Sequence, residues 1–224
     1  MQHEKKAGAV PHDPRTDQRG VTVYEPGQAQ NGLTLYTSGH DQKARLIDMD
    51  GRVVREWGVP FSQIWDKTAA VKSPQPDSHV YIEKTYLYPN GDLLALYVAV
   101  GDTPWGYGLV KYDRDSNIIW KYLAHVHHDL TVAPDGRIFV LTQEIGHDDI
   151  AQYPHLRAPR IDDYVAVLSP EGQEILAIME EVLNAGFVHL DAGQPNELYV
   201  WPYFFAMPLD KLDKRQRVEL FKIV

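Results

Sequence analysis

The stretch HHDLTVAPDGRIFVL, residues 127–141, carries the strongest fold signal in this chain. One apolar run ends at Ala133, the residues Pro134-Asp135-Gly136 follow, and a second apolar run begins at Ile138. Asp-Gly between two strand-like runs is a strong hairpin signal, because such turns need positive φ at both central positions. The stretch therefore predicts a β-hairpin whose first strand begins with two adjacent histidines.

The same pattern recurs along the chain. Turn signals of the Asn-Gly, Asp-Gly or Asn-Glu type precede apolar runs at Asn31, Asn90, Asp135 and Asn196, which are 45 to 61 residues apart. A second set of hairpins alternates with these, in the stretches 46–57, 109–120 and 165–176. Two hairpins make a four-stranded unit, and a period of roughly 50 residues with four strands is typical of a β-propeller blade.

We therefore predict an all-β protein, a β-propeller of four-stranded blades. About three and a half blades would be present, as in a partial or shortened six-bladed propeller. Residues 21–205 would form this partial propeller, after a flexible leader at 1–20 and before an amphipathic or frayed segment at 206–224. Open strand edges favour pairing with another chain, so a homo-oligomer is one expectation. The stretches 60–77 and 144–163 are predicted to be long loops between blades.

Composition narrows the functional classes. The net charge of −9 argues against a nucleic-acid partner, which requires a basic patch. No apolar run has transmembrane length, and the polar stretch from Met1 to Asp17 shows no signal peptide, so the compartment stays unknown. The absence of cysteine excludes disulfides, zinc–thiolate sites and a thiol nucleophile. We expect no cofactor and one domain with a single substantial core.

Two histidines occupy equivalent places in two repeats. His128 lies six residues before Pro134, and His189 lies six residues before Pro195. The first strand of each propeller blade lines the central channel, so these two imidazoles should face a common ligand. The aligned column of the two earlier repeats and an aromatic run add further candidates for the substrate-binding rim: Tyr24, Glu83 and Trp105. The tryptophans that end outer strands, Trp57 and Trp120, are expected in the core instead.

Several of these residues together resemble a known family. The stretches 20–24, 32–36 and 44–51, followed by His127-His128-Asp129 before Pro134-Asp135-Gly136, are similar to the arylsulfotransferase family of bacterial six-bladed propellers. The resemblance covers about residues 20 to 200, the front half of a family member. It implies transfer of a sulfuryl group from a phenolic sulfate ester to another phenol, without a nucleotide donor and through a sulfated histidine. Members of the family are often exported to the periplasm.

The resemblance also implies roles for individual residues. The family's first active-site histidine corresponds to His128, with His127 as the second choice. The next motif is similar to His189-Leu190-Asp191, where Asp191 stands in place of the family's asparagine. A carboxylate repels a sulfate ester, whereas an amide donates a hydrogen bond to it. The family's nucleophilic histidine corresponds to a position beyond Val224, so this chain is expected to hold only part of the site and to be inactive alone.

Two other functions remain open. A non-catalytic propeller scaffold that binds a ligand or partner is favoured because Asp191 stands where the family has an asparagine. A metal-dependent hydrolase is the third hypothesis, because His125, His127 and Asp129 alternate along one strand and could bind zinc or a redox metal. A solvated polar strand end is the favoured explanation of this cluster. Metallohydrolases with this motif continue with another histidine where this chain has Leu130, and they need helices that the sequence does not predict. No metal site is therefore assigned.

Overall fold

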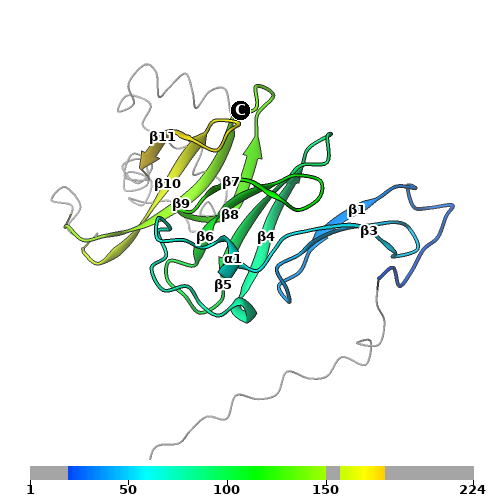
Figure 1. The fold of residues 1–224 in the computed structure, drawn as a ribbon, viewed down its shortest axis with the longest axis horizontal. Helices are drawn as coiled ribbons and strands as arrows, with labels where there is room; N and C mark the ends of the chain where they lie inside the picture. The colour runs from blue at the N-terminus through cyan, green and yellow to red at the C-terminus, as the bar shows by residue number, and fades with distance from the viewer. Residues whose placement is uncertain (1–19, 150–156, 180–224) are drawn as a thin grey trace, which may run out of the picture. The chain divides into compact units, whose positions relative to one another are not determined.

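The structure, a computed structural model, describes residues 20–149 and 157–179. Predictions for residues 1–19, 150–156 and 180–224, including the strand turn at Asn196, lie outside the described residues. Within these two ranges the fold is mostly β, with three antiparallel sheets and one short α-helix (Figure 1). The described residues form two compact units, one containing residues up to Tyr36 with Arg45–Glu56 and the other containing Thr37–Ala44 with the chain from Trp57. Across the two described ranges, no helix combines the length and apolar character needed to cross a membrane.

Most residues of the first sheet belong to the first unit, and this sheet has three strands instead of the predicted four. Its strands are β1 (Thr34–Thr37), β2 (Ala44–Ile47) and β3 (Val53–Trp57), in that order. Residues 21–24, expected to supply a first strand, form none. The backbone N–H groups of Gln28 and Ala29 both donate to the carbonyl of Glu25, at 2.9 Å each. A local turn therefore takes up the segment that was expected to pair.

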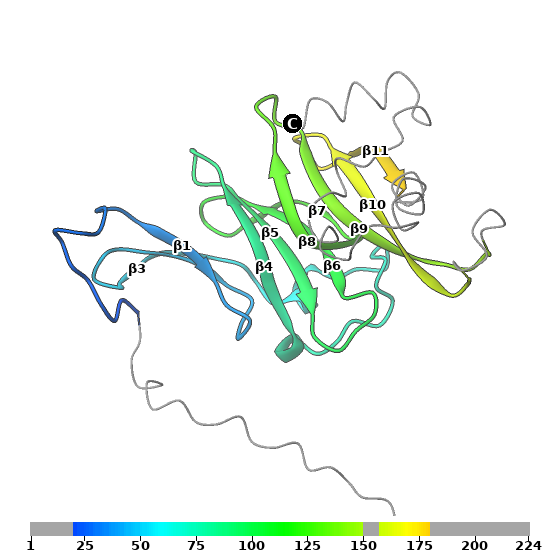
Figure 2. The ribbon, with the colours of Figure 1, turned by 180° about the vertical axis from the view of Figure 1, so that it is seen from behind.

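The described part of the second unit contains two four-stranded sheets. Successive strands are neighbours in each sheet, in the orders β4-β5-β6-β7 and β8-β9-β10-β11 (Figures 1 and 2). The strand bounds are β4 Val80–Leu87, β5 Leu93–Ala99, β6 Gly106–Tyr112, β7 Ile118–Tyr122, β8 His125–Val132, β9 Ile138–Gly146, β10 Arg160–Leu168 and β11 Glu174–Met179. The predicted hairpins at Asn90 and Asp135, and those within 109–120 and 165–176, are confirmed.

The predicted long loop at 144–163 is too long at both ends. The β9–β10 ladder runs without interruption from Ile138 paired with Leu168 to Gly146 paired with Arg160. The connection between these strands is therefore confined to residues 147–159, and Asp162 and Asp163 lie within the sheet. The apolar pattern of the sequence did not predict these strand ends, because their residues are largely polar. A β-ladder depends on backbone hydrogen bonds and can therefore extend beyond the apolar run.

One type of five-residue loop closes five of the described hairpins, those of β2–β3, β4–β5, β6–β7, β8–β9 and β10–β11. The N–H of its first residue donates to the carbonyl of its fifth, and the N–H of its fourth donates to the carbonyl of its first, at 2.7 to 3.1 Å. The loops begin at Asp48, Tyr88, Asp113, Ala133 and Ser169. Their fourth residues, Gly51, Gly91, Ser116, Gly136 and Gly172, have positive φ. The expectation of positive φ at both central positions is wrong, because these are longer loops with a single left-handed position.

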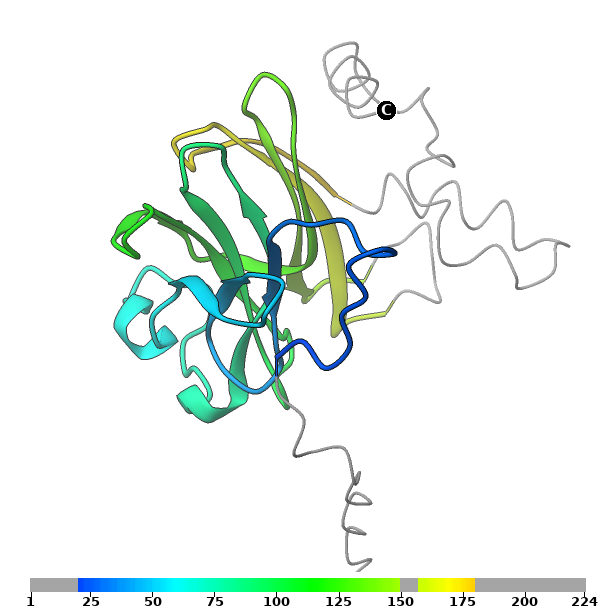
Figure 3. The same ribbon diagram turned by 90° about the vertical axis from the view of Figure 1, so that its right-hand side faces the viewer.

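The main core lies between the two sheets of the second unit. It contains Leu94, Leu96, Val98 and Leu109 from β5 and β6, and Val126, Leu130, Ile138, Val140, Ala166 and Leu168 from β8, β9 and β10. β5 is buried along its whole length, as expected for a strand covered on both faces. The turn between β4 and β5 and the turn between β8 and β9 project from the same end of this unit (Figure 3). Burial of this apolar surface is the main force that joins the two sheets.

The residues between β3 and β4 cover the other face of β5 and β6. This segment contains α1 (Phe61–Ile64) and the 3₁₀-helix η1 (Asp77–His79). The Phe61 ring packs at centroid distances of 4.9 Å from Tyr107 and 5.9 Å from Tyr97. The Tyr97 hydroxyl lies 3.1 Å from the Val59 carbonyl, to which it donates, and 2.8 Å from the Tyr112 hydroxyl. The predicted loop at 60–77 is thus a cover for buried tyrosines.

These tyrosines predict a loss of stability at high pH. Burial raises the pKa of Tyr112 to about 12, and burial together with the neighbouring Tyr112 raises the pKa of Tyr97 well above its ordinary value of 10. Because the folded state holds these protons more tightly, the stabilisation is complete below pH 10 and is lost as the pH rises toward 12. We expect Tyr112 alone to lower the free energy of unfolding by roughly 2 kcal/mol across this window, and Tyr97 to add to that fall. Urea unfolding at several pH values measures it, and Tyr112→Phe should flatten the fall whereas the exposed Tyr36→Phe should not.

Candidate functional site

A β-bulge in β8 gives the adjacent residues His127 and His128 different environments. The pairing of β8 with β9 shifts between His127 and Leu130, so His128 and Asp129 lie outside the ladder. His128 has a φ of 59°, in the left-handed region that non-glycine residues rarely adopt. β-Bulges redirect side chains and are common next to active sites. Here the bulge leaves His127 buried, with 3% of its surface exposed, and turns His128 outward.

The bulge is held by a carboxylate from the other sheet. The backbone N–H of His128, released from the ladder, donates to Oε2 of Glu83 at 2.9 Å. Glu83 itself is skipped in the pairing of β4 with β5, where the register shifts between Ile82 and Lys84. The first strands of the two sheets, β4 and β8, therefore meet where each of them has a register shift in its pairing. This bond connects residues that lie 45 positions apart in the sequence.

The two imidazoles are hydrogen-bonded to each other. Nδ1 of His127 lies 2.6 Å from Nδ1 of His128, and the ring planes are nearly perpendicular, with centroids 4.9 Å apart. Both rings also meet the Trp105 indole edge to face, at centroid distances of 5.6 Å and 5.5 Å. The Trp105 carbonyl accepts the Ala99 N–H at 2.9 Å, which anchors the indole at the start of β6. The site thus combines an exposed imidazole, a buried one and an aromatic wall.

Charged side chains surround this pair. Asp163 on β10 places Oδ1 3.3 Å from Nε2 of His127, close enough for an ion pair with a protonated ring. Asp129, the other bulged residue, pairs with Lys84 of β4 at 2.9 Å. His125, at the start of β8, donates from Nδ1 to the Gly106 carbonyl at 2.9 Å. The cluster therefore contains the carboxylates of Glu83 and Asp163, which contact the histidine pair, and the ion pair of Asp129 with Lys84.

Comparisons of the sequence with protein-family models and with curated proteins find no match. The likeness to arylsulfotransferases therefore rests on the motifs quoted above.

The structure brings together four of the residues selected from the sequence: Glu83, Trp105, His127 and His128. His189 and Asp191 lie outside the described residues. Sequence reasoning missed Lys84, which follows a bulge that no sequence pattern announces, and it placed Asp163 in a predicted loop. Asp163 could have been located only by extending the predicted strand at 165–168 toward its N-terminus, which would have paired Asp163 with Gln143.

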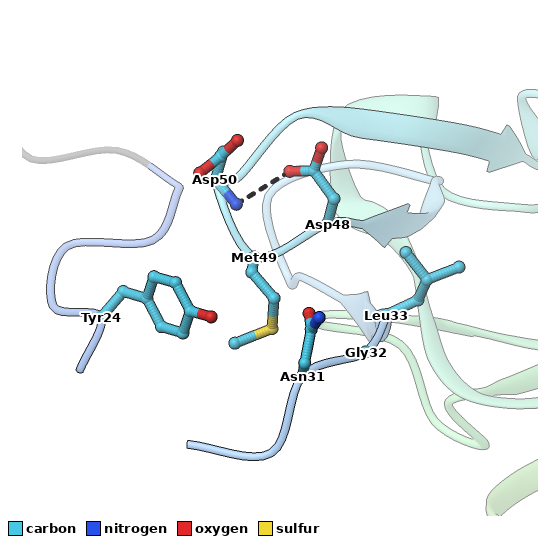
Figure 4. A pocket seen from close by; sticks show the side chains of 7 residues that line it. All are labelled: Tyr24, Asn31, Gly32, Leu33, Asp48, Met49 and Asp50. Atoms are coloured by element: carbon cyan, nitrogen blue, oxygen red, sulfur yellow. Dashed lines mark hydrogen bonds between the residues drawn. The ribbon is translucent and has the colours of Figure 1, made fainter. Parts of the chain in front are cut away.

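Tyr24 belongs to the first unit. It lines a shallow, open pocket of about 510 Å³ with Asn31, Gly32, Leu33, Asp48, Met49 and Asp50. Figure 4 shows the Tyr24 hydroxyl pointing toward Met49, and the carboxylate of Asp48 accepting the Asp50 N–H at 2.9 Å. These acidic groups already serve the turn between β2 and β3, so the pocket has no obvious chemistry of its own.

The three residues considered as metal ligands because they alternate along one strand, His125, His127 and Asp129, do not form a metal site in the described part of the chain. His125 is bonded to the Gly106 carbonyl, His127 to His128, and Asp129 to Lys84. The bulge at His128 breaks the alternation on which the set was based. Among the residues that the structure describes, no three histidine or acidic side chains come together at a spacing suited to a metal ion.

Proposed function

We propose that the two four-stranded sheets are successive blades of a β-propeller. In each sheet the strands follow one another in chain order, and one type of five-residue loop closes the first and the last hairpin of both. β8 packs against β4, β5 and β6, so the first strands of the two sheets lie together. This arrangement supports the proposal, because the first strands of propeller blades surround a common channel.

Within this framework, the function that the site supports best is that of a histidine-dependent transferase of the arylsulfotransferase type. The carrying observation is the exposed His128 ring, fixed by buried His127 and flanked by Trp105. Sites for aryl ligands have aromatic walls with few polar groups. An imidazole in such a site can take the proton of an attacking phenol or return one to a phenolate. The substrates would be a phenolic sulfate ester and a phenol.

Each residue of the cluster has a role in this proposal. Sulfuryl transfer, like phosphoryl transfer, spreads negative charge over equatorial oxygens, so catalysis depends on positioning and on positive charge. Lys84, which is paired with Asp129, the residue after His128 in the chain, would supply that charge. Trp105 would pack on the aryl ring, and His128 would handle the phenol proton. Glu83 would hold the bulge through the His128 N–H.

One observation favours the second candidate, a non-catalytic propeller that binds a ligand. Glu83, Asp129 and Asp163 all lie near the imidazole pair, with Lys84 as the cation paired among them. Like charges repel at these separations, so this balance suits a neutral or cationic aromatic ligand better than an anionic ester. The charge of the preferred ligand therefore separates the two functions.

Titration of the chain with 4-nitrophenyl sulfate and with phenyltrimethylammonium, followed by calorimetry, tests both. The transferase proposal predicts weak, saturable binding of the sulfate ester. His128→Ala should weaken it roughly tenfold, as for loss of one hydrogen bond to a charged group. Glu83→Gln should tighten it severalfold, because the amide removes a negative charge while its oxygen can still accept the His128 N–H. His147→Ala, in an exposed connection, is the matched control.

Preference for the cationic probe, weakened by Glu83→Gln, would reject the transferase in favour of the ligand-binding scaffold. Binding of the sulfate ester that His128→Ala leaves unchanged would exclude the proposed site. Release of 4-nitrophenol with phenol as acceptor would place the nucleophile among the histidines of this chain, with His128 the first to examine.

A further inference from the structure

We infer that Asp163, His127 and His128 form a tautomer relay that leaves a lone pair on Nε2 of the exposed His128. The relay runs from Asp163 Oδ1 to Nε2 of His127 over 3.3 Å, and from Nδ1 of His127 to Nδ1 of His128 over 2.6 Å. It would make His127 and Asp163 positioning residues, which act through His128. Its use in proton transfer rests on the proposed function, whereas its existence does not.

The first step concerns the short contact between the rings. Two nitrogens 2.6 Å apart share one proton, because two N–H groups would clash and two lone pairs would repel. One ring therefore donates from Nδ1 and the other accepts there. The two rings cannot both carry a proton on Nδ1 while this contact exists, so the tautomer of one ring fixes the tautomer of the other.

The second step assigns the donor. Nε2 of His127 is buried and makes no aligned hydrogen bond to any residue in the described ranges, yet it faces the Asp163 carboxylate at 3.3 Å. A lone pair pointing at an anionic oxygen is unfavourable, whereas an N–H in that place is attracted to it. The proton of neutral His127 therefore belongs on Nε2. Its Nδ1 is then the acceptor, and His128 must donate from its own Nδ1.

The third step follows for His128. A neutral ring that carries its proton on Nδ1 has its lone pair on Nε2. Neutral histidine in water prefers the opposite tautomer, with the proton on Nε2. The relay therefore holds the exposed ring in its less common form and presents a proton acceptor beside Trp105, which the unassisted side chain would mostly lack.

Three polar groups close to the pair have other partners. Glu83 accepts the backbone N–H of His128, Asp129 pairs with Lys84, and His125 donates to the Gly106 carbonyl. Asp163 is the carboxylate that faces the far nitrogen of His127. These contacts leave the ring nitrogens of the pair to each other and to Asp163.

The relay also gives a balanced proton path. When a phenol O–H bond breaks and an Nε2–H bond forms on His128, that ring becomes a cation. Its Nδ1 proton can then cross to Nδ1 of His127, which leaves neutral His128 and a cationic His127 beside the Asp163 carboxylate. The buried cation is thereby paired with an anion, the usual requirement for buried charge. Return of the phenol proton reverses each step.

Nitrogen-15 NMR of the imidazoles in the unliganded chain distinguishes the tautomers directly. We expect His128 as the Nδ1–H form and His127 as the Nε2–H form. His127→Phe keeps a ring of similar size but removes the acceptor, so His128 should revert to the Nε2–H form. Asp163→Asn should change the His127 tautomer, whereas Asp115→Asn in an exposed turn should not. His125, held as Nδ1–H by the Gly106 carbonyl, reports in every variant whether the fold persists.

An Nε2–H tautomer of His128 in the unaltered chain would overturn the relay. So would an unchanged His128 spectrum in His127→Phe with the His125 signal intact. If His127→Phe does not fold, Asp163→Asn decides alone, and an unchanged His127 tautomer there rejects the role of Asp163. Because no substrate is present, failure of aryl sulfate binding leaves these results standing, and their failure leaves the binding experiment unaffected.

Discussion

Replacement of Gly106 by alanine is expected to lower the free energy of unfolding by more than about 3 kcal/mol, beyond the usual range for a point substitution. A Cβ at this position would lie 2.4 Å from the carbonyl oxygen of Val126 and 2.7 Å from the carbonyl carbon and oxygen of His125. All three are backbone atoms of β8, so no side chain can rotate to make room. The two sheets would have to separate where β6 meets β8.

Urea unfolding monitored by tryptophan fluorescence gives the size of this effect. Gly101→Ala is the control, because Gly101 has a φ of 80° but open space where the new Cβ would lie. It should show backbone strain alone, about 1–2 kcal/mol. Equal losses in the two variants would show that the close approach of β6 to β8 does not constrain residue 106.

Trp120→Ala is expected to cost about 3 kcal/mol, near the lower end for loss of a large packed aromatic residue. The Trp120 ring packs against the core between the sheets and donates from Nε1 to the Pro170 carbonyl at 3.1 Å. It also occupies the space above Gly172, where a Cβ would lie 2.5 Å from the indole. Trp120 thus joins the outer strand β7 to the turn between β10 and β11.

Trp120→Phe separates the packing from the hydrogen bond. It should cost about 1 kcal/mol, the usual net value of one bond, together with a little lost contact. Tyr122→Phe removes the neighbouring link from the Tyr122 hydroxyl to Glu174 and provides a second comparison on β7. If Trp120→Ala costs no more than Trp120→Phe, the indole does not hold the sheets together.

The hairpins of the second unit could be predicted because their signals are local. In the turn at Asn90-Gly91, the Asn90 side chain accepts the Asp92 N–H at 3.1 Å, and Gly91 supplies the left-handed backbone. Both requirements act within five residues, so the sequence shows them. The strand expected at 21–24 fails for the opposite reason. Its pairing depended on long-range partners, and a turn at Glu25 satisfied the chain locally.

For the candidate site, the sequence predicted which residues would take part but not how their side chains are arranged. The shared column suggested that Glu83 and His128 would converge, and the structure places Glu83 against the His128 backbone N–H. The bulge itself has no sequence signal, since histidine is an uncommon residue at positive φ. The different burial of His127 and His128, and the approach of Asp163 to His127, both follow from that bulge and from an extended β10 ladder. Alternation alone therefore suggested a metal set that does not assemble.

The absence of a side chain at Gly106 also affects how motion passes through the site. β6 contacts β8 through backbone atoms there, and the Gly106 carbonyl is bonded to the His125 ring. A side-chain contact can absorb a small displacement by a change of rotamer, but a backbone contact cannot. A shift of the connection that carries Trp105 is therefore transmitted directly to the histidine strand. The indole and the paired imidazoles should move as one body, so that a ligand entering beside Trp105 meets the rings at a constant spacing.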